Sequence, residues 1–245
     1  LAREGFTSSD SPFEGFYGLQ HLTGEFAPRL PVLADGPSVV EMSHQKPIPA
    51  ETQALGLLEL VPRLRAWSPV DEIESIELHV SHHVAEHIAD PPKFDPRTRE
   101  TADHSLPYML AVALVDGVIT LASYRPERFL DPTLRPLMNK MTIVPTQTYS
   151  DLRANGMYGV TRPAPARLIA RRTNGDVFDQ EVIYFKGHMR DPMTRADIDA
   201  KLNLICAGVV TDADRDRLRA AWWDIADAPD ITDLIALLTR PETAA

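Results

Sequence analysis

DPRTRETADHSLPYMLAVALVDG, residues Asp95–Gly117, is the segment around which we expect this chain to fold. It opens with charged and turn-forming residues, and the run Met109–Val115 that follows is apolar throughout. Such a run is expected to be buried on all sides, but periodicity alone does not separate a buried helix from a buried strand. The flanks favour a helix, because they carry residues suited to its two ends. These residues are Asp103 or Ser105 as the cap, Pro107 in the first turn and Gly117 just past the end.

The amino end of this predicted helix holds Asp103, His104, Ser105 and Tyr108. These side chains bring polar groups to the edge of a core, where the free backbone N–H groups of a helix start suit an anion. A core helix with ordinary caps accounts for the same residues, and periodicity alone favours that simpler interpretation.

Three segments carry a resemblance to a known family. The run Arg99–Gly117, RETADHSLPYMLAVALVDG, resembles the signature of the MmgE/PrpD family, which includes 2-methylcitrate dehydratases and cis-aconitate decarboxylases. KPIPAETQA (Lys46–Ala54) resembles the family's Lys-x-x-Pro-Ala-Glu/His segment. KGHMRDPMTRADIDAKL (Lys186–Leu202) resembles its Gly-His followed by proline and a helix. The three segments occur in the family's order, and the resemblance covers essentially the whole chain.

The resemblance implies an α+β fold, in which a smaller α/β lid domain is inserted in a discontinuous all-helical domain. Residues 1–40 would end the first helical segment, residues 41–188 would form the lid, and residues 189–245 would be C-terminal helices returning to the helical domain. The sequence begins LAREGFTSSD, without an initiator methionine, and the family's first half has no counterpart in it. We therefore expect one half of a split enzyme, with a partner chain supplying the N-terminal helical half, in a homodimer or heteromer.

Local patterns elsewhere also predict a mixed α+β chain. The predicted helices are a short one capped by Asp10 or Ser11 and running through Leu19, one with its apolar face over Ala54–Leu64, one holding Ile198–Ile205, and a helical tail to Leu238. The predicted strands lie at Ile76–Val80 and Met141–Val144, and a hairpin turns at Asn174-Gly175, a dipeptide typical of tight β-turns.

Composition excludes several classes of function. Acidic residues outnumber basic ones 35 to 25 and no Lys/Arg-rich block occurs, so a nucleic-acid partner is not expected. The net charge of −10 also means that any site for an anionic substrate must be locally basic. No apolar stretch approaches the ~20 residues of a membrane-spanning helix and no signal peptide is visible, so a cytoplasmic protein is expected.

Four histidines, at positions 79, 82, 83 and 87, follow or end the first predicted strand. His83 and His87 would share a helix face and could bind zinc. A third ligand of suitable spacing is missing, and isolated histidine pairs usually decorate a solvated face. We therefore expect no metal, as the resemblance also implies.

The resemblance implies an activity: dehydration of 2-methylcitrate, or a related tricarboxylic 2-hydroxy acid, by a hydro-lyase of propionate metabolism. This reaction needs a base to take a proton next to a carboxylate, an acid to protonate the departing hydroxyl, and cations to hold the carboxylates. Aconitase-type enzymes use an iron–sulfur cluster, which the single Cys206 cannot build within one chain. A cofactor-free acid/base site is therefore expected.

The catalytic candidates are Lys46, His104 and Tyr108, and the substrate-binding candidates are Glu51, Asp103, Ser105 and His188. Lys46 would bind a carboxylate or protonate the leaving group, and His104 would transfer protons because its ordinary pKa of ~6.5 lies near working pH. Tyr108 would donate a hydrogen bond into the same cleft, and Asp103 would either orient His104 or only cap the helix. Glu51 matches the family's segment, but the aromatic-histidine pair that usually follows it is missing.

Two other functions compete with dehydration. The first is decarboxylation or epimerisation of a related polycarboxylate, which also needs proton transfer next to a carboxylate. The second is a non-catalytic, degenerate subunit that binds polycarboxylates, which the missing residues after Glu51 and the absent first half favour.

Overall fold

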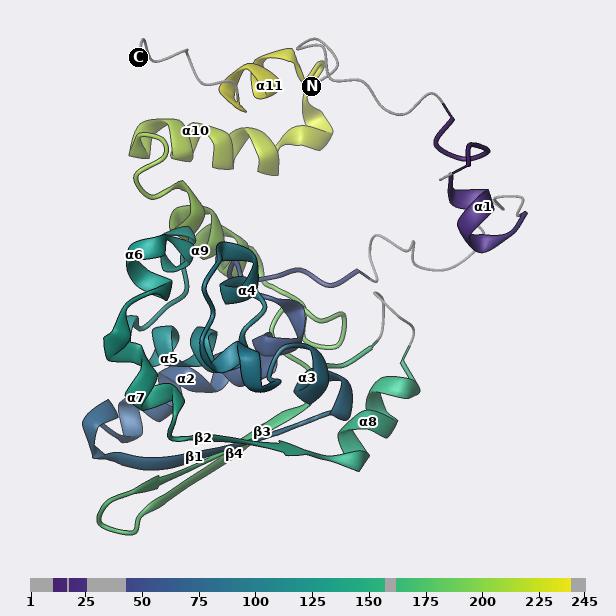
Figure 1. Cartoon of the computed structure of the whole chain (residues 1–245). Helices are drawn as coiled ribbons and strands as arrows, with labels where there is room; N and C mark the ends of the chain where they lie inside the picture. The colour runs from purple at the N-terminus through teal and green to yellow at the C-terminus, as the bar shows by residue number, and fades with distance from the viewer. Residues whose placement is uncertain (1–10, 17, 26–42, 157–161, 239–245) are drawn as a thin grey trace. The chain divides into compact units, whose positions relative to one another are not determined.

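The computed structural model describes residues 11–16, 18–25, 43–156 and 162–238 (Figure 1). The chain divides into two units, Leu1–Ser38 and Val39–Ala245, and each is described by itself. In the first unit, helix α1 spans Leu19–Thr23 and follows a series of turns. The helix predicted to run through Leu19 therefore begins only there, because Gly15 and Gly18 close the chain into turns. Asp10 lies outside the described residues.

The second unit is built on a mixed four-stranded sheet in the order β2-β1-β3-β4. The strands are β1 (Ile73–Val80), β2 (Met141–Pro145), β3 (Ala166–Arg172) and β4 (Val177–Val182). β1 pairs with β2 in parallel and with β3 in antiparallel orientation. β3 and β4 form the hairpin predicted at Asn174-Gly175, which is confirmed.

Two long helices cover one face of this sheet (Figure 1). α2 (Leu55–Trp67) packs on β3 and β4, and α5 (Leu106–Asp116) packs against α2. Every residue from Leu106 to Leu114 is buried, which confirms the predicted burial except at Val115, the last residue of the run, which is 47% exposed. Ser105 is the cap, its hydroxyl accepting from the Tyr108 N–H at 3.1 Å, and Gly117 ends the helix with φ +90°.

The parallel pairing of β1 with β2 requires a crossover connection, and this connection contains α5. The other helices of the crossover are α3 (His82–His87), α4 (Arg99–Asp103), α6 (Pro126–Phe129) and α7 (Arg135–Met138). α8 (Gln147–Ala154) follows β2 directly. The crossover thus supplies most of the helices of this unit.

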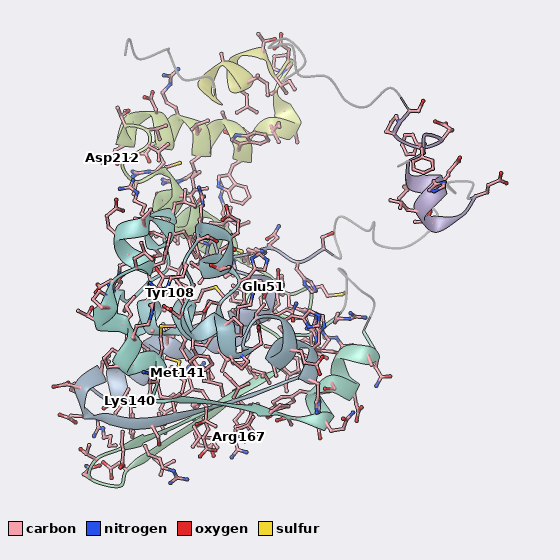
Figure 2. All side chains as sticks on the ribbon, viewed as in Figure 1. Glu51, Tyr108, Lys140, Met141, Arg167 and Asp212 are labelled. Atoms are coloured by element: carbon pink, nitrogen blue, oxygen red, sulfur yellow. The ribbon has the colours of Figure 1, made fainter. Side chains whose placement is uncertain are left out.

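The opposite face of the sheet is polar. Ile76, Leu78 and Val80 are buried, and the residues that alternate with them are more exposed, which confirms the predicted half-buried strand. On β3, Arg167 lies on the face away from α2 and forms two hydrogen bonds to the Asp179 carboxylate, of 2.6 and 2.5 Å (Figure 2). The core therefore lies between the sheet and the helices, as expected for an α+β domain.

Three helices follow the sheet: α9 (Arg195–Cys206), α10 (Asp212–Trp223) and α11 (Thr232–Leu238). They confirm the predicted helical tail. The indole N–H of Trp223 donates to Asp199 at 2.9 Å, and the Arg195 guanidinium lies 4.4 Å from the Trp223 ring centroid. α9 contributes no buried residue. Across the described parts of the chain, no helix is both long and apolar enough to cross a membrane.

The fold confirms the predicted α+β class. The further prediction, that this part is a lid inserted in a discontinuous helical domain with boundaries near residues 40 and 188, stays a prediction.

Candidate anion-binding pocket

A pocket of about 310 Å³ lies in the second unit, and three separate segments of the chain line it. The first segment precedes α2 and contributes Ser43, His44, Lys46, Glu51, Thr52 and Gln53. The second is Arg153 near the end of α8, and the third is Arg162, Pro163 and Ala164, just before β3. This volume lies at the lower end of the range for small-molecule sites, about 300–1,000 Å³.

Gly187 holds the first segment in place. The Gln45 N–H donates to the Gly187 carbonyl at 2.8 Å. Gly187 has φ +100°, and a Cβ atom built on it would lie 1.9 Å from the Gln45 carbonyl oxygen. Only glycine permits this backbone approach without a shift of the chain. The Gly-His pair is thus a tight turn against which the lead-in to Lys46 packs.

A cluster of aromatic and imidazole rings extends this contact. The His44 ring lies 4.5 Å from the His188 ring and 5.4 Å from the Phe185 ring, measured between centroids. His188 is completely buried, and its Nδ1 accepts a hydrogen bond from the Arg190 N–H at 3.0 Å. An Nδ1 that accepts leaves the ring proton on Nε2. His188 therefore supports His44 from behind and is not among the residues that line the pocket.

Two further close approaches bring the other segments together. A Cβ on Gly56 would lie 2.5 Å from the Ala164 carbonyl oxygen, so the first turn of α2 packs directly on that segment. A Cβ on Gly156 would lie 2.5 Å from the Arg162 Cα. The Arg153 guanidinium donates from Nη1 to the Pro163 carbonyl at 3.1 Å. These contacts place the two arginines beside the start of α2.

Glu51 contributes the carboxylate of the pocket. Its Oε2 accepts from the Gln53 N–H at 2.5 Å and so caps the short 3₁₀ turn Thr52–Ala54 that leads into α2. The preceding backbone is anchored because the Tyr124 hydroxyl donates to the Pro49 carbonyl at 2.8 Å. Lys46 is exposed, and in the residues the structure describes its ammonium makes no hydrogen bond or ion pair.

The charge of the pocket differs from that of the chain as a whole. Among the described residues that line the pocket, Lys46, Arg153 and Arg162 are basic and Glu51 is acidic, in a chain of net charge −10. Low-dielectric walls strengthen such a local field. The site thus has the local basic character that an anionic substrate requires.

The structure places the predicted site residues in different environments. Lys46 and Glu51 line the pocket. His188 does not line it, but packs against the ring of His44, which does. The Asp103 carboxylate contacts His104 Nδ1 at 2.5 Å, and both side chains are substantially exposed. They end α4, which packs on the 3₁₀ turn containing Tyr124. The pair does not line the pocket.

Tyr108 and Ser105 take part in the core. The Tyr108 hydroxyl donates to the Ser123 carbonyl, and burial raises the pKa of this tyrosine. The Ser105 hydroxyl donates to the Lys93 carbonyl at 2.5 Å besides capping α5. His104 and Tyr108 do not lie on one helix, contrary to the prediction from the sequence. A break at Ser105 puts His104 at the end of α4 and Tyr108 inside α5.

Replacing Tyr108 with Phe is expected to lower the free energy of unfolding by about 1–3 kcal/mol, because the buried Ser123 carbonyl would lose its donor. Urea unfolding followed by circular dichroism measures this change. Tyr184→Phe is the control, because its ring is half-buried beside His188 and its hydroxyl makes no hydrogen bond within the described parts of the chain. Unchanged stability of the Tyr108 variant would show that its hydroxyl bond is dispensable.

Sequence reasoning did not single out Arg153, Arg162 or His44 as site residues. The available signal was weak: the two arginines stand on either side of the turn-forming dipeptide Asn155-Gly156 in the sequence. His83 and His87 on α3, which the sequence analysis considered as zinc ligands, do not line the pocket. The His83 and His87 rings lie 4.1 Å apart, and His87 Nδ1 contacts the His83 carbonyl at 2.8 Å. Among the described residues, no group of three potential metal ligands occurs.

Comparisons with known proteins agree with this architecture. The family model for the MmgE/PrpD C-terminal domain matches residues 48–225. Mouse cis-aconitate decarboxylase is 24% identical over 193 residues, which cover 78% of this chain and 37% of that relative. The chain thus spans less than half the length of this curated relative. The matched range contains Glu51, Arg153 and Arg162 of the pocket. From its family model and its fold, this chain belongs to the MmgE/PrpD family and corresponds to its C-terminal domain.

Proposed function

We propose that this chain contributes the pocket of an MmgE/PrpD-type lyase, which acts on a polycarboxylic acid by acid/base catalysis. The observation that carries the proposal is that Lys46, Arg153 and Arg162 line the same pocket as the Glu51 carboxylate. Cations of this kind bind substrate carboxylates, and a carboxylate beside them can take a proton from the carbon next to one.

For dehydration of a 2-hydroxy acid, the Glu51 carboxylate would take the proton next to a substrate carboxylate. The Lys46 ammonium would give a proton to the departing hydroxyl, so that a C=C bond forms and water leaves. His44 also lines the pocket, and its imidazole would carry the proton between substrate and solvent. The assignment of proton transfer to His104 stays a prediction, which His104→Gln tests.

Decarboxylation is the second candidate, because the relative in mouse is a cis-aconitate decarboxylase. In that reaction the cations would hold the remaining carboxylates while a C–C bond breaks and CO₂ leaves. The carbanion then takes a proton from Lys46 or His44. The same residues therefore serve either reaction, and the position of the scissile bond in the pocket would distinguish them.

We also propose that residues outside this domain complete the site, as a helical half within the same polypeptide or on a partner chain. The support is that the relative is much longer than the matched segment. Homodimerisation and the identity of 2-methylcitrate as substrate are further proposals that rest on the family alone.

Proton NMR of reaction mixtures tests the proposed function. The chain, alone and co-expressed with a family helical half, is incubated with 2-methylcitrate, citrate and cis-aconitate. Dehydration of citrate is expected to produce a new alkene proton signal, dehydration of 2-methylcitrate at its methyl-bearing carbon to turn the methyl doublet into a singlet, and decarboxylation to release CO₂ from cis-aconitate. Heat-inactivated protein is the control. Failure of both preparations to convert any of these acids would contradict the proposal and favour a non-catalytic binding subunit.

A further inference from the structure

Gln53 differs from the charged residues of the pocket, because its side-chain amide is not tied to the protein. The residue is half-buried, lines the pocket and lies on the 3₁₀ turn Thr52–Ala54. Its backbone N–H donates to Glu51 Oε2 at 2.5 Å. Within the described parts of the chain its side-chain amide makes no hydrogen bond, and its Oε1 is enclosed without a donor. The backbone of Gln53 is therefore fixed, while its amide has no partner there.

An enclosed amide oxygen without a donor is unusual in a folded protein. Leaving it unpaired costs free energy, because the water that would donate to it has been removed. Most buried polar side-chain atoms have a partner, so an exception calls for a physical reason. The last side-chain torsion of glutamine is broad and roughly two-fold, so a half-turn exchanges Oε1 with Nε2. Gln53 can thus turn its oxygen out of the enclosed position and offer it to a donor in the pocket.

The chemistry of an amide oxygen decides which ligand group it fits, because it can only accept hydrogen bonds. An ionised carboxylate also only accepts, so the carboxylates of an acid offer no proton to this oxygen. They suit Lys46, whose ammonium only donates. A hydroxyl on the acid can donate. One oxygen of the Glu51 carboxylate is already taken by the Gln53 N–H, and the proposed reaction uses this carboxylate as the base.

We propose that the Gln53 amide oxygen accepts a hydrogen bond from the substrate's hydroxyl, so that Gln53 distinguishes hydroxylated acids from acids that lack this group. The inference rests on the proposed function, because it assigns a specificity-determining residue to the same pocket. In dehydration this hydroxyl is the leaving group. A hydroxyl that donates to Gln53 keeps its lone pairs open to the proton that Lys46 would give. The assignment favours dehydration over decarboxylation of cis-aconitate, which has no hydroxyl.

Isothermal titration calorimetry of the full chain tests this role, with citrate and tricarballylate as probes. The two tricarboxylates differ only in the citrate hydroxyl. Both are titrated at matched ionic strength and at a pH where all their carboxylates are ionised. Citrate is expected to bind about 10-fold more tightly, because a site that bonds a hydroxyl leaves its own acceptor unpaired when the analogue binds.

Gln53→Met keeps the length of the side chain and removes the amide. It is expected to weaken citrate binding about 10-fold and to leave tricarballylate binding unchanged, so that the two affinities become equal. Because the lost oxygen has no donor in the free chain, the variant is expected to unfold at the wild-type temperature or above it. Gln180→Met is the control. It lies on an exposed position of β4 outside the pocket lining, and is expected to change neither affinity.

Two further variants separate the acceptor from its surroundings. Gln53→Glu keeps an acceptor of the same shape and adds a negative charge. It is expected to weaken the binding of both acids while preserving the preference for citrate. Thr52→Val removes the hydroxyl of a neighbouring lining residue, and is expected to keep the wild-type preference.

Five results would overturn the role of Gln53. They are absence of citrate binding by the wild-type chain at millimolar concentration, equal wild-type affinities for the two acids, equal weakening of both acids by Gln53→Met, loss of the preference in Thr52→Val, and a lower unfolding temperature of Gln53→Met. The last result would show that the amide serves the fold.

These results are separable from those of the turnover assay. A chain that prefers citrate through Gln53 without converting any acid keeps this inference and loses the lyase. A chain that converts acids while Gln53→Met leaves the preference unchanged keeps the lyase and loses this inference.

Discussion

Replacing Gly187 with Ala is expected to lower the free energy of unfolding by about 3–5 kcal/mol. Two costs add at this position. The residue has φ +100°, where an L side chain is strained, and its new Cβ would lie 1.9 Å from the Gln45 carbonyl oxygen. Because that neighbour is backbone, the segment carrying His44 and Lys46 would have to move away. Urea unfolding of the full chain, followed by circular dichroism, measures the loss.

Gly175→Ala is the matched control. This glycine in the β3–β4 turn has φ +93°, but a Cβ built on it meets nothing within 4 Å. Its replacement is expected to cost only the backbone strain, about 1–2 kcal/mol. The difference between the two variants isolates the close approach of Gly187 to Gln45. Equal losses for both would show that the turn at Gly187 does not hold the Lys46 segment.

Lys46→Met is expected to reduce turnover about 10²- to 10⁴-fold, the usual contribution of a residue that transfers a proton in the rate-determining step. The change removes a cation from the pocket while keeping a side chain of similar length. Because Lys46 is exposed, its replacement is expected to leave stability nearly unchanged. The measurement is kcat and kcat/KM with whichever acid the NMR assay shows to be converted.

Lys201→Met, on α9 and outside the pocket lining, is the control for the lost charge. It is expected to keep wild-type kcat. If Lys46→Met raises KM alone and leaves kcat unchanged, the lysine only binds substrate and gives no proton to the leaving group. If both lysine variants retain full activity, Lys46 has no part in the reaction.

The sequence itself determined several of the main elements of this protein and the residues at their ends. Ser105, Pro107 and Gly117 mark the ends of α5, because a cap hydroxyl, a proline in the first turn and a glycine past the end each satisfy local backbone requirements. The turn at Asn174-Gly175 and the alternation of buried and exposed residues along β1 could be predicted for the same reason. The family could also be recognised from the sequence, through motifs that include Lys46 and Glu51.

Tertiary structure alone decided which side chains meet. His104 and Tyr108 are close in sequence, but Ser105 separates their helices and the Tyr108 hydroxyl is taken by the buried Ser123 carbonyl. Gln45 and Gly187 are distant in sequence, yet their backbones touch. The physical reason is that caps and turns depend on neighbouring residues, whereas the pocket depends on backbone approaches between remote segments. Arg153 and Arg162 became site residues only through that packing.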